Sequence, residues 1–146
     1  MNVDALDGSY FIDTNVLIHT FDSTAPDKQR LAQDIVTHAL RTQRGAISSQ
    51  VVQEFLNAAL KKFTVPMSVS DARAYTQAVL LPLCQHFPSQ QSYDHALLLK
   101  EETGFAFYDA LIVAAAADIG CATLLSEDLQ HGRKIRGLTI FNPFRA

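Results

Sequence analysis

Short apolar runs alternate with longer segments of helical period along this chain. Runs of this kind are typical of buried strands. Four of them are three or four residues long and end next to a turn-forming residue: 10–12, 46–48, 122–125 and 138–141. Residues 85–87 add a weaker candidate before Pro88. Because strands alternate with helices, we predict a three-layer α/β/α fold with a central, mostly parallel sheet of four to five short strands.

Segments of helical period fill the stretches between these runs. We expect helices at 15–21, 26–44, 49–63 and 70–81, from Ser89 or Ser92 to Gly104, and at 108–119. We predict that Gly45 ends the second helix and that Ser49 caps the third. Ser70-Asp71 is expected to cap the fourth, which Pro82 interrupts. The last helix is almost entirely apolar, so it must be buried on most sides.

The composition is that of an ordinary globular chain. Of its 146 residues 48% are hydrophobic and 18% are charged, and the length suits one domain spanning residues 1–146. The longest apolar run, 110–117, is far shorter than the ~20 residues of a membrane span. The first nine residues contain two Asp and no basic residue, so we expect no signal peptide, a cytoplasmic location and no membrane contact. Cys84 and Cys121 are expected to be reduced thiols.

Four acidic residues lie at the ends of these segments. Asp13 and Asp128 follow strands, whereas Glu54 and Asp109 lie near the starts of helices. In a parallel sheet such positions gather at the edge where ligands bind. A group of carboxylates there is costly unless a divalent cation neutralises it. The chain offers no His or Cys set with the spacing of a zinc site. The pattern therefore predicts a Mg²⁺ or Mn²⁺ site and a metal-dependent nuclease.

Each acid also has a purely structural interpretation. Asp13 could simply cap a helix, and the helix dipole suffices to explain Asp109. Glu127 competes with Asp128 for the position after its strand. Glu54 lies on the polar face of its helix, so periodicity alone predicts a solvated side chain.

Four segments resemble the sequence blocks of PIN-domain ribonucleases, and within that superfamily of VapC-type toxins from bacterial toxin–antitoxin pairs. The segments are Phe-Ile-Asp-Thr-Asn-Val-Leu-Ile-His, Glu-Phe-Leu-Asn, Tyr-Asp-Ala-Leu-Ile-Val-Ala-Ala-Ala and Leu-Leu-Ser-Glu-Asp-Leu-Gln-His-Gly. The resemblance covers essentially the whole chain. It implies that a metal-binding and catalytic set is formed by Asp13, Glu54, Asp109 and Asp128. It also implies supporting roles for the hydroxyls of Thr14 and Ser126.

The resemblance further implies an activity and partners. PIN-domain toxins are Mg²⁺- or Mn²⁺-dependent endoribonucleases, in which an ion activates water for in-line attack on an RNA phosphodiester. The expected partners are an RNA substrate, a cognate antitoxin protein and a second copy in a homodimer. The formal net charge of −3 does not suggest bulk attraction to RNA. By position alone, Arg133, Lys134 and Arg136 are candidate phosphate contacts.

Three other functions use the same features. A phospho-acceptor domain is disfavoured, because the first strand is followed by a single Asp and no Lys directly follows a late strand. A metal-dependent DNA nuclease or a phosphatase would need the same acids. A non-catalytic interaction domain is the third alternative.

Overall fold

Six strands form one sheet in the computed structural model, which describes residues 1–145; residue 146 of the predicted domain lies outside this range. The strands are β1 (Tyr10–Ile12), β2 (Gly45–Ser48), β3 (Cys84–His86), β4 (Thr123–Leu125), β5 (Lys134–Ile135) and β6 (Leu138–Phe141). Their order is β3-β2-β1-β4-β6-β5, and all neighbours are parallel except β5, which runs antiparallel to β6. Four to five strands were expected, and the sheet has six because it also contains the short strand β5.

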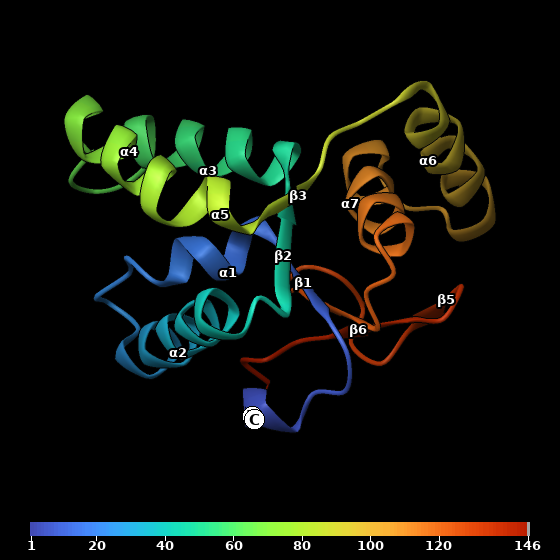
Figure 1. The fold of residues 1–146 in the computed structure, drawn as a ribbon, viewed down its shortest axis with the longest axis horizontal. Helices are drawn as coiled ribbons and strands as arrows, with labels where there is room; N and C mark the ends of the chain where they lie inside the picture. The colour runs from blue at the N-terminus through green and yellow to red at the C-terminus, as the bar shows by residue number, and fades with distance from the viewer. Residues whose placement is uncertain (146) are drawn as a thin grey trace.

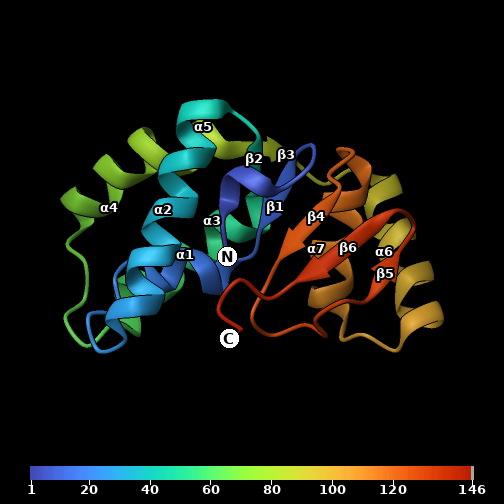
Figure 2. The ribbon, with the colours of Figure 1, turned by 90° about the horizontal axis from the view of Figure 1, so that it is seen from below.

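Helices cover both faces of this sheet, as the predicted α/β/α layers require (Figures 1 and 2). A short 3-10 turn, η1 (Val3–Ala5), precedes β1. One face carries α1 (Thr14–His19), α2 (Pro26–Thr42), α3 (Ser49–Lys61), α4 (Val69–Tyr75), the π-helical segment η2 (Thr76–Leu80) and α5 (Leu81–Leu83). The other face carries α6 (Gln90–Thr103) and α7 (Phe107–Asp118). The apolar α7 is buried along most of its length, as its sequence predicted.

β1 is the central strand that places the site. Its three residues, Tyr10, Phe11 and Ile12, are fully buried. Ile12 pairs with Leu125 of β4, and Tyr10 pairs with Gly45 of β2. Because these strands are parallel, their carboxyl ends share one edge of the sheet. The residues that follow β1 and β4 are therefore neighbours in space.

Gly45 begins β2 instead of ending α2, which corrects the prediction from the sequence. The residue at the end of α2 is Gln43, with the left-handed φ of 58°. A Cβ at Gly45 would overlap the Cβ of Ala39 and lie 2.8 Å from the ring of Tyr10. Glycine is therefore required here by the close packing of α2 against the sheet, and not by a helix end.

Three further helix predictions were wrong in detail. Ser48 and not Ser49 caps α3, and Ser68 caps α4 in place of Ser70-Asp71. Pro82 does not interrupt the helical path, which runs without a break from α4 through η2 to Leu83. The π-helical turn of η2 lies just before Pro82, whose ring and missing N–H would disturb a regular α-helix. Ser89 caps α6 through a capping box, and Gly104 ends it with φ 77°, as predicted.

Both cysteines, Cys84 and Cys121, are free thiols, as expected. Among the helices of residues 1–145, none has the length and apolar character needed to cross a membrane.

Candidate metal-binding and catalytic site

Asp13 lies directly after β1, where it caps α1. Its Oδ1 accepts a hydrogen bond from the backbone N–H of Thr14 at 2.8 Å. Its Oδ2 accepts from the hydroxyl of Ser126 at 2.8 Å and from the side-chain amide of Asn15 at 3.2 Å. The residue is only 8% exposed. Capping and membership of an acidic site, which the sequence presented as alternatives, are therefore compatible in this residue.

Asn15 joins the acid after β1 to the acid after β4. Its side-chain amide donates to Oδ2 of Asp13 and also, at 3.1 Å, to Oδ2 of Asp128. Its Oδ1 accepts from the backbone N–H of Glu127 at 3.1 Å. Ser126 supports the same link, because its Oγ accepts from the backbone N–H of Asp128 at 3.2 Å while donating to Asp13. Asp13 and Asp128 are thus held together by two side chains.

Glu127 points away from this network. Its two carboxylate oxygens lie 2.9 Å from Nε2 of His19 and 2.7 Å from Nζ of Lys28. Burial acts to raise the pKa of Glu127, but hydrogen bonds from Lys28 and His19 bring it below its usual value. Glu127 is therefore occupied by a separate ion pair, and Asp128 is the acid that lies beside Asp13.

Thr14 and Gln50 bring Glu54 to the same edge of the sheet. The hydroxyl of Thr14 donates to Oε1 of Glu54 at 2.7 Å, and Nε2 of Gln50 lies 3.3 Å from Oε2. Gln50 also donates to the carbonyl of Tyr108 at 3.1 Å, one residue before Asp109. Glu54 is half-buried and not solvated as periodicity alone predicted. The reason is tertiary: α3 starts at the carboxyl edge and packs against α1.

The four carboxylates interact through their charges. Burial raises the pKa of Asp13 to about 6, although hydrogen bonds from Ser126 and Thr14 act to lower it. The charges of Glu54 and Asp128 raise it further. Burial also raises the pKa of Asp109, and the charges of Asp128 and Glu54 add to that effect. Because Asp13 and Asp109 both respond to the other two acids, the four form one electrostatic group.

Within residues 1–145 no basic side chain pairs with this group; the ion pairs there use Asp4, Asp27, Glu102, Asp118 and Glu127. No set of three or more His, Cys, Asp or Glu side chains in this part of the chain is already arranged to hold a metal ion. The chemistry of the donors nevertheless fits Mg²⁺ or Mn²⁺, which prefer oxygen ligands. Mg²⁺ usually keeps several waters and binds through only one or two carboxylates, so a closed cage is not required.

The predicted phosphate contacts lie on the hairpin of β5 and β6, at the end of the sheet (Figure 2). The guanidinium of Arg133 lies over the ring of Phe105 at 4.7 Å. Arg136 is paired with Glu102 at 2.7 Å and sits in the turn before β6, away from the carboxyl end of that strand. Lys134 is exposed in β5. The structure does not bring Arg133, Lys134 or Arg136 to the acids, so their contact with phosphate stays a prediction without geometric support.

Two polar residues of the site were not predicted from the sequence. Asn15 contacts both Asp13 and Asp128, and Gln50 contacts Glu54. In the sequence, Asn15 could be suspected only because it follows Asp13 by two residues. Gln50 could be suspected only because it precedes Glu54 by four residues, about one helical turn. Ordinary surface positions of a helix show the same signals, so only the tertiary contacts identify these two residues.

Comparison with known proteins identifies the family of this chain. The family model of the PIN domain matches residues 10–136, a range that contains all four acids. The chain belongs to the PIN-domain family. PIN domains have the three-layer α/β/α fold described above, are generally nucleases and typically use divalent metal ions.

A chain from a solved structure, described as "Toxin-antitoxin complex from Klebsiella pneumoniae", is similar to this PIN domain. The two chains superpose with a TM-score of 0.68 and share 23% sequence identity, over 94% of this chain and 100% of that chain. At this identity the likeness concerns the fold. No curated protein sequence matches the chain.

Proposed function

We propose that this PIN domain is an endoribonuclease that uses Mg²⁺ or Mn²⁺ to hydrolyse RNA phosphodiester bonds. The observation that supports the proposal is the set of hydrogen bonds through Thr14, Asn15 and Gln50 at the carboxyl edge of the sheet. These bonds connect Asp13, Glu54 and Asp128 with the start of α7, where Asp109 lies. Burial and the charges of Glu54 and Asp128 raise the pKa of Asp13 and Asp109. Such a group is costly without a counter-charge. A divalent cation supplies that charge and also offsets the repulsion between the acids and an RNA backbone.

The four acids divide the work in this proposal. Asp13, Asp109 and Asp128 would hold the ion directly, and Glu54 would add a ligand or orient the attacking water. When bound, the ion would polarise the phosphodiester, activate water and stabilise the departing oxygen.

The residues around the acids fix their positions. Thr14 holds one oxygen of Glu54, which leaves the carboxylate little freedom to turn. Ser126 and Asn15 fix Oδ2 of Asp13, and Asn15 keeps Asp128 beside it. Such supporting contacts orient ligands and commonly matter 10–100-fold for affinity or activity.

The test compares three substrates. Purified protein is incubated with single-stranded RNA, with DNA of the same sequence and with a phosphomonoester, each with Mg²⁺, Mn²⁺ or EDTA. We expect only the RNA to be cut, only when an ion is present, and not by Asp109→Asn. Cleavage of DNA or of the monoester in place of RNA would make the protein a DNA nuclease or a phosphatase. Ion binding without any cleavage would favour an interaction domain.

We further propose that the protein is the toxin of a toxin–antitoxin pair, acts on RNA in the cytoplasm and inhibits growth or translation. The fold shared with a chain of a toxin–antitoxin complex supports this proposal. The acidic group, which has no basic partner within residues 1–145, suits a basic side chain from a cognate antitoxin. A homodimer is expected from the family resemblance, and light scattering of the purified chain tests it.

Expression in a bacterial host tests the toxin proposal. The wild-type chain should arrest growth, and Asp13→Asn should not. Sequencing of total RNA after brief expression, with Asp109→Asn as the control, would identify the RNA that is cut. Growth arrest that persists undiminished in both variants would show that nuclease action is not its cause.

A further inference from the structure

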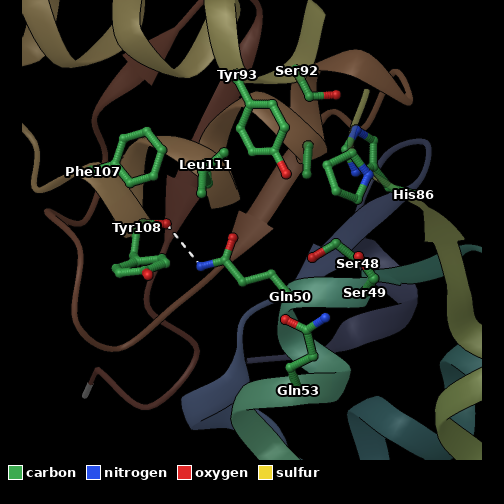
Figure 3. A pocket seen from close by; sticks show the side chains of 12 residues that line it. Ser48, Ser49, Gln50, Gln53, His86, Ser92, Tyr93, Phe107, Tyr108 and Leu111 are labelled. Carbon is green, nitrogen blue, oxygen red and sulfur yellow. Dashed lines mark hydrogen bonds between the residues drawn. The ribbon is translucent and has the colours of Figure 1, made fainter. Parts of the chain in front are cut away.

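A pocket of about 270 Å³ opens next to the acidic group, between the starts of α3, α6 and α7 and the end of β3 (Figure 3). Gln50 belongs to both places. Its Nε2 donates to the carbonyl of Tyr108, a bond that Figure 3 marks, and also to Oε2 of Glu54. Tyr108 lines the pocket and directly precedes Asp109. The pocket and the acidic group are therefore adjacent, with Gln50 and Tyr108 between them.

Aromatic rings form one side of this pocket. Tyr93 of α6 is 48% exposed and Tyr108 of α7 is 66% exposed, and Figure 3 shows the hydroxyl of Tyr93 directed into the pocket. Phe107 meets Tyr108 edge to face, with ring centroids 5.6 Å apart and an interplanar angle of 65°. The exposed faces of Tyr93 and Tyr108 are available to stack on a ligand.

Neutral hydrogen-bonding groups form the opposite side. Ser48, Ser49, Gln50 and Gln53 at the start of α3 line it, and His86 of β3 closes one end. The lining contains no Asp, Glu, Lys or Arg. Hydroxyls, amides and helix starts can contact a phosphate, but the lining has no Lys or Arg to balance its charge, and a phosphate would leave the aromatic rings unused. An aliphatic side chain would not need so many donors and acceptors. The pocket instead suits a flat, neutral ligand with polar edges.

The size of the pocket limits the ligand to about one ring system. Its volume is slightly below the ~300–1,000 Å³ of sites for drug-sized ligands. Single-stranded RNA is recognised by the same combination of groups, because its unstacked bases stack on aromatic side chains and hydrogen-bond along their edges. A nucleobase therefore satisfies the shape, the neutrality and the polar edges of the pocket at once.

We propose that this pocket binds one nucleobase of single-stranded RNA, adjacent to the phosphodiester at the acidic group. The choice of RNA as ligand rests on the nuclease function proposed above. Tyr93 and Tyr108 stack on the base. Oε1 of Gln50, whose N–H groups are used by Tyr108 and Glu54, accepts from the edge of the base, and the amide of Gln53 also hydrogen-bonds it. Because Gln50 also contacts Glu54, an occupied pocket steadies the carboxylate assigned to the attacking water. The pocket would then select the nucleotide beside the cleavage point.

Titration with free ribonucleosides tests the pocket without metal or phosphate. Adenosine, guanosine, cytidine and uridine are added to labelled protein in EDTA, and NMR shifts of Gln50 and Tyr108 are followed. We expect at least one nucleoside to shift these signals. Tyr93→Ala and Tyr108→Ala should weaken its binding about 5- to 150-fold, whereas Tyr93→Phe, which keeps the ring, should not. Phe87→Ala is the matched control, because Phe87 is 68% exposed and does not line the pocket.

Cleavage of a short RNA that the protein cuts provides the second measurement. Each nucleotide in turn is replaced by an abasic one. At one position next to the cleaved bond the replacement should lower kcat/KM about 5- to 150-fold for the wild-type chain and for Phe87→Ala. The same replacement should have little further effect in Tyr93→Ala or Tyr108→Ala, because the lost base and the lost ring act on the same contact.

The two measurements separate the pocket from the nuclease function. If nucleosides bind as expected but no RNA is cut, the pocket is supported and the nuclease function is overturned. If RNA is cut, but no nucleoside shifts these signals and the abasic effects are independent of Tyr93 and Tyr108, the nuclease function is supported and the pocket proposal is overturned. A pocket that accommodates a partner protein and no base would give this second result. Absence of both binding and cleavage overturns both proposals.

Discussion

The hydroxyl of Thr14 donates a hydrogen bond to Glu54 at 2.7 Å and so connects the helix after β1 to the helix after β2. Thr14 is 8% exposed, and its backbone N–H is already used by Asp13. One residue thus supports two acids, one through its backbone and the other through its side chain.

Removal of that hydroxyl should loosen Glu54 without disturbing Asp13. Thr14→Val keeps the shape and the backbone bond, so we expect a stability loss of about 1 kcal/mol. Cleavage should fall roughly 10–100-fold, because a contact that orients a site residue is lost. Thr14→Ser, which retains the hydroxyl, should keep most of the activity. Equal activity of the Val and Ser variants would show that this bond has no part in the reaction.

Asp13→Asn should stabilise the metal-free protein while abolishing cleavage. Burial raises the pKa of Asp13 to about 6, so the ionised side chain costs about 3 kcal/mol at pH 8 by linkage. Asn caps a helix as well as Asp does. Urea unfolding in EDTA, followed by far-UV circular dichroism because the chain has no Trp, should show a gain of roughly 1–3 kcal/mol. Asn replaces the Oδ2 that accepts from Ser126 and Asn15 by an amide nitrogen, which offsets part of this gain. A loss of stability that is equal at pH 4 and pH 8 would show that these hydrogen bonds, and not the charge of Asp13, set the effect.

The gain in stability caused by Asp13→Asn should depend on pH. A carboxyl group whose folded-state pKa is raised binds its proton more tightly in the folded state. The stabilisation that comes from this proton is complete at pH values below the ordinary pKa of 3.8, and it is lost as the pH rises through the folded-state pKa of about 6. The difference in unfolding free energy between Asp13→Asn and the wild-type chain should therefore be smallest near pH 4 and largest above pH 6. Mn²⁺ affinity should fall as the pH drops below about 6, because protons compete for Asp13.

Asp128 and its neighbour Glu127 should differ sharply in effect. Asp128→Asn should abolish ion-dependent cleavage, because this side chain lies beside Asp13 through Asn15. Glu127→Gln should leave cleavage largely intact and lower stability by up to about 1 kcal/mol, the usual range for a partly exposed ion pair. Cleavage rates and unfolding curves of the two variants, measured in parallel, decide the assignment. A Glu127→Gln variant as inactive as Asp128→Asn would mean that both acids act.

Gly45→Ala should destabilise the fold by about 1–3 kcal/mol, because its Cβ would lie against Ala39 and the ring of Tyr10. Adding Ala39→Gly should recover part of that loss, since one of the two overlapping methyl groups is removed. A thermodynamic cycle of the single and double variants measures the coupling. If the two effects simply add, the contact between Ala39 and residue 45 is not the cause.

The fold class and the positions of Asp13 and Asp128 after their strands could be predicted from the sequence, because both depend on local alternation and turn chemistry. Periodicity could not place Glu54 in the site, since its helix shows the same polar face whether water or Thr14 lies beside it; only the resemblance to PIN-domain ribonucleases pointed to this residue. Asn15 and Gln50 needed the tertiary contacts. β5 was missed because two residues have no period of their own, and Lys134–Ile135 becomes a strand only by pairing with β6.

Helix ends show the same limit on a smaller scale. Ser48 and Ser49 are adjacent and chemically equal, so composition cannot choose the cap of α3. The choice is made by the backbone, because Ser48 has the extended conformation that a capping residue needs and Ser49 is already helical. Gly45 was assigned to a helix end because glycine is common there, although the space between Ala39 and Tyr10 is what requires it.

The contact between Asn15 and Asp128 spans 113 positions of the chain. The central strand β1 cannot complete its pairing on one side until β4 is present. On the ribosome, β1 and β2 can emerge and meet long before β4 has been translated. A nascent polypeptide therefore lacks an assembled acidic group until β4 and Asp128 have been translated. Should the folded protein attack RNA as proposed, a growing chain could not cut the messenger that encodes it before that point.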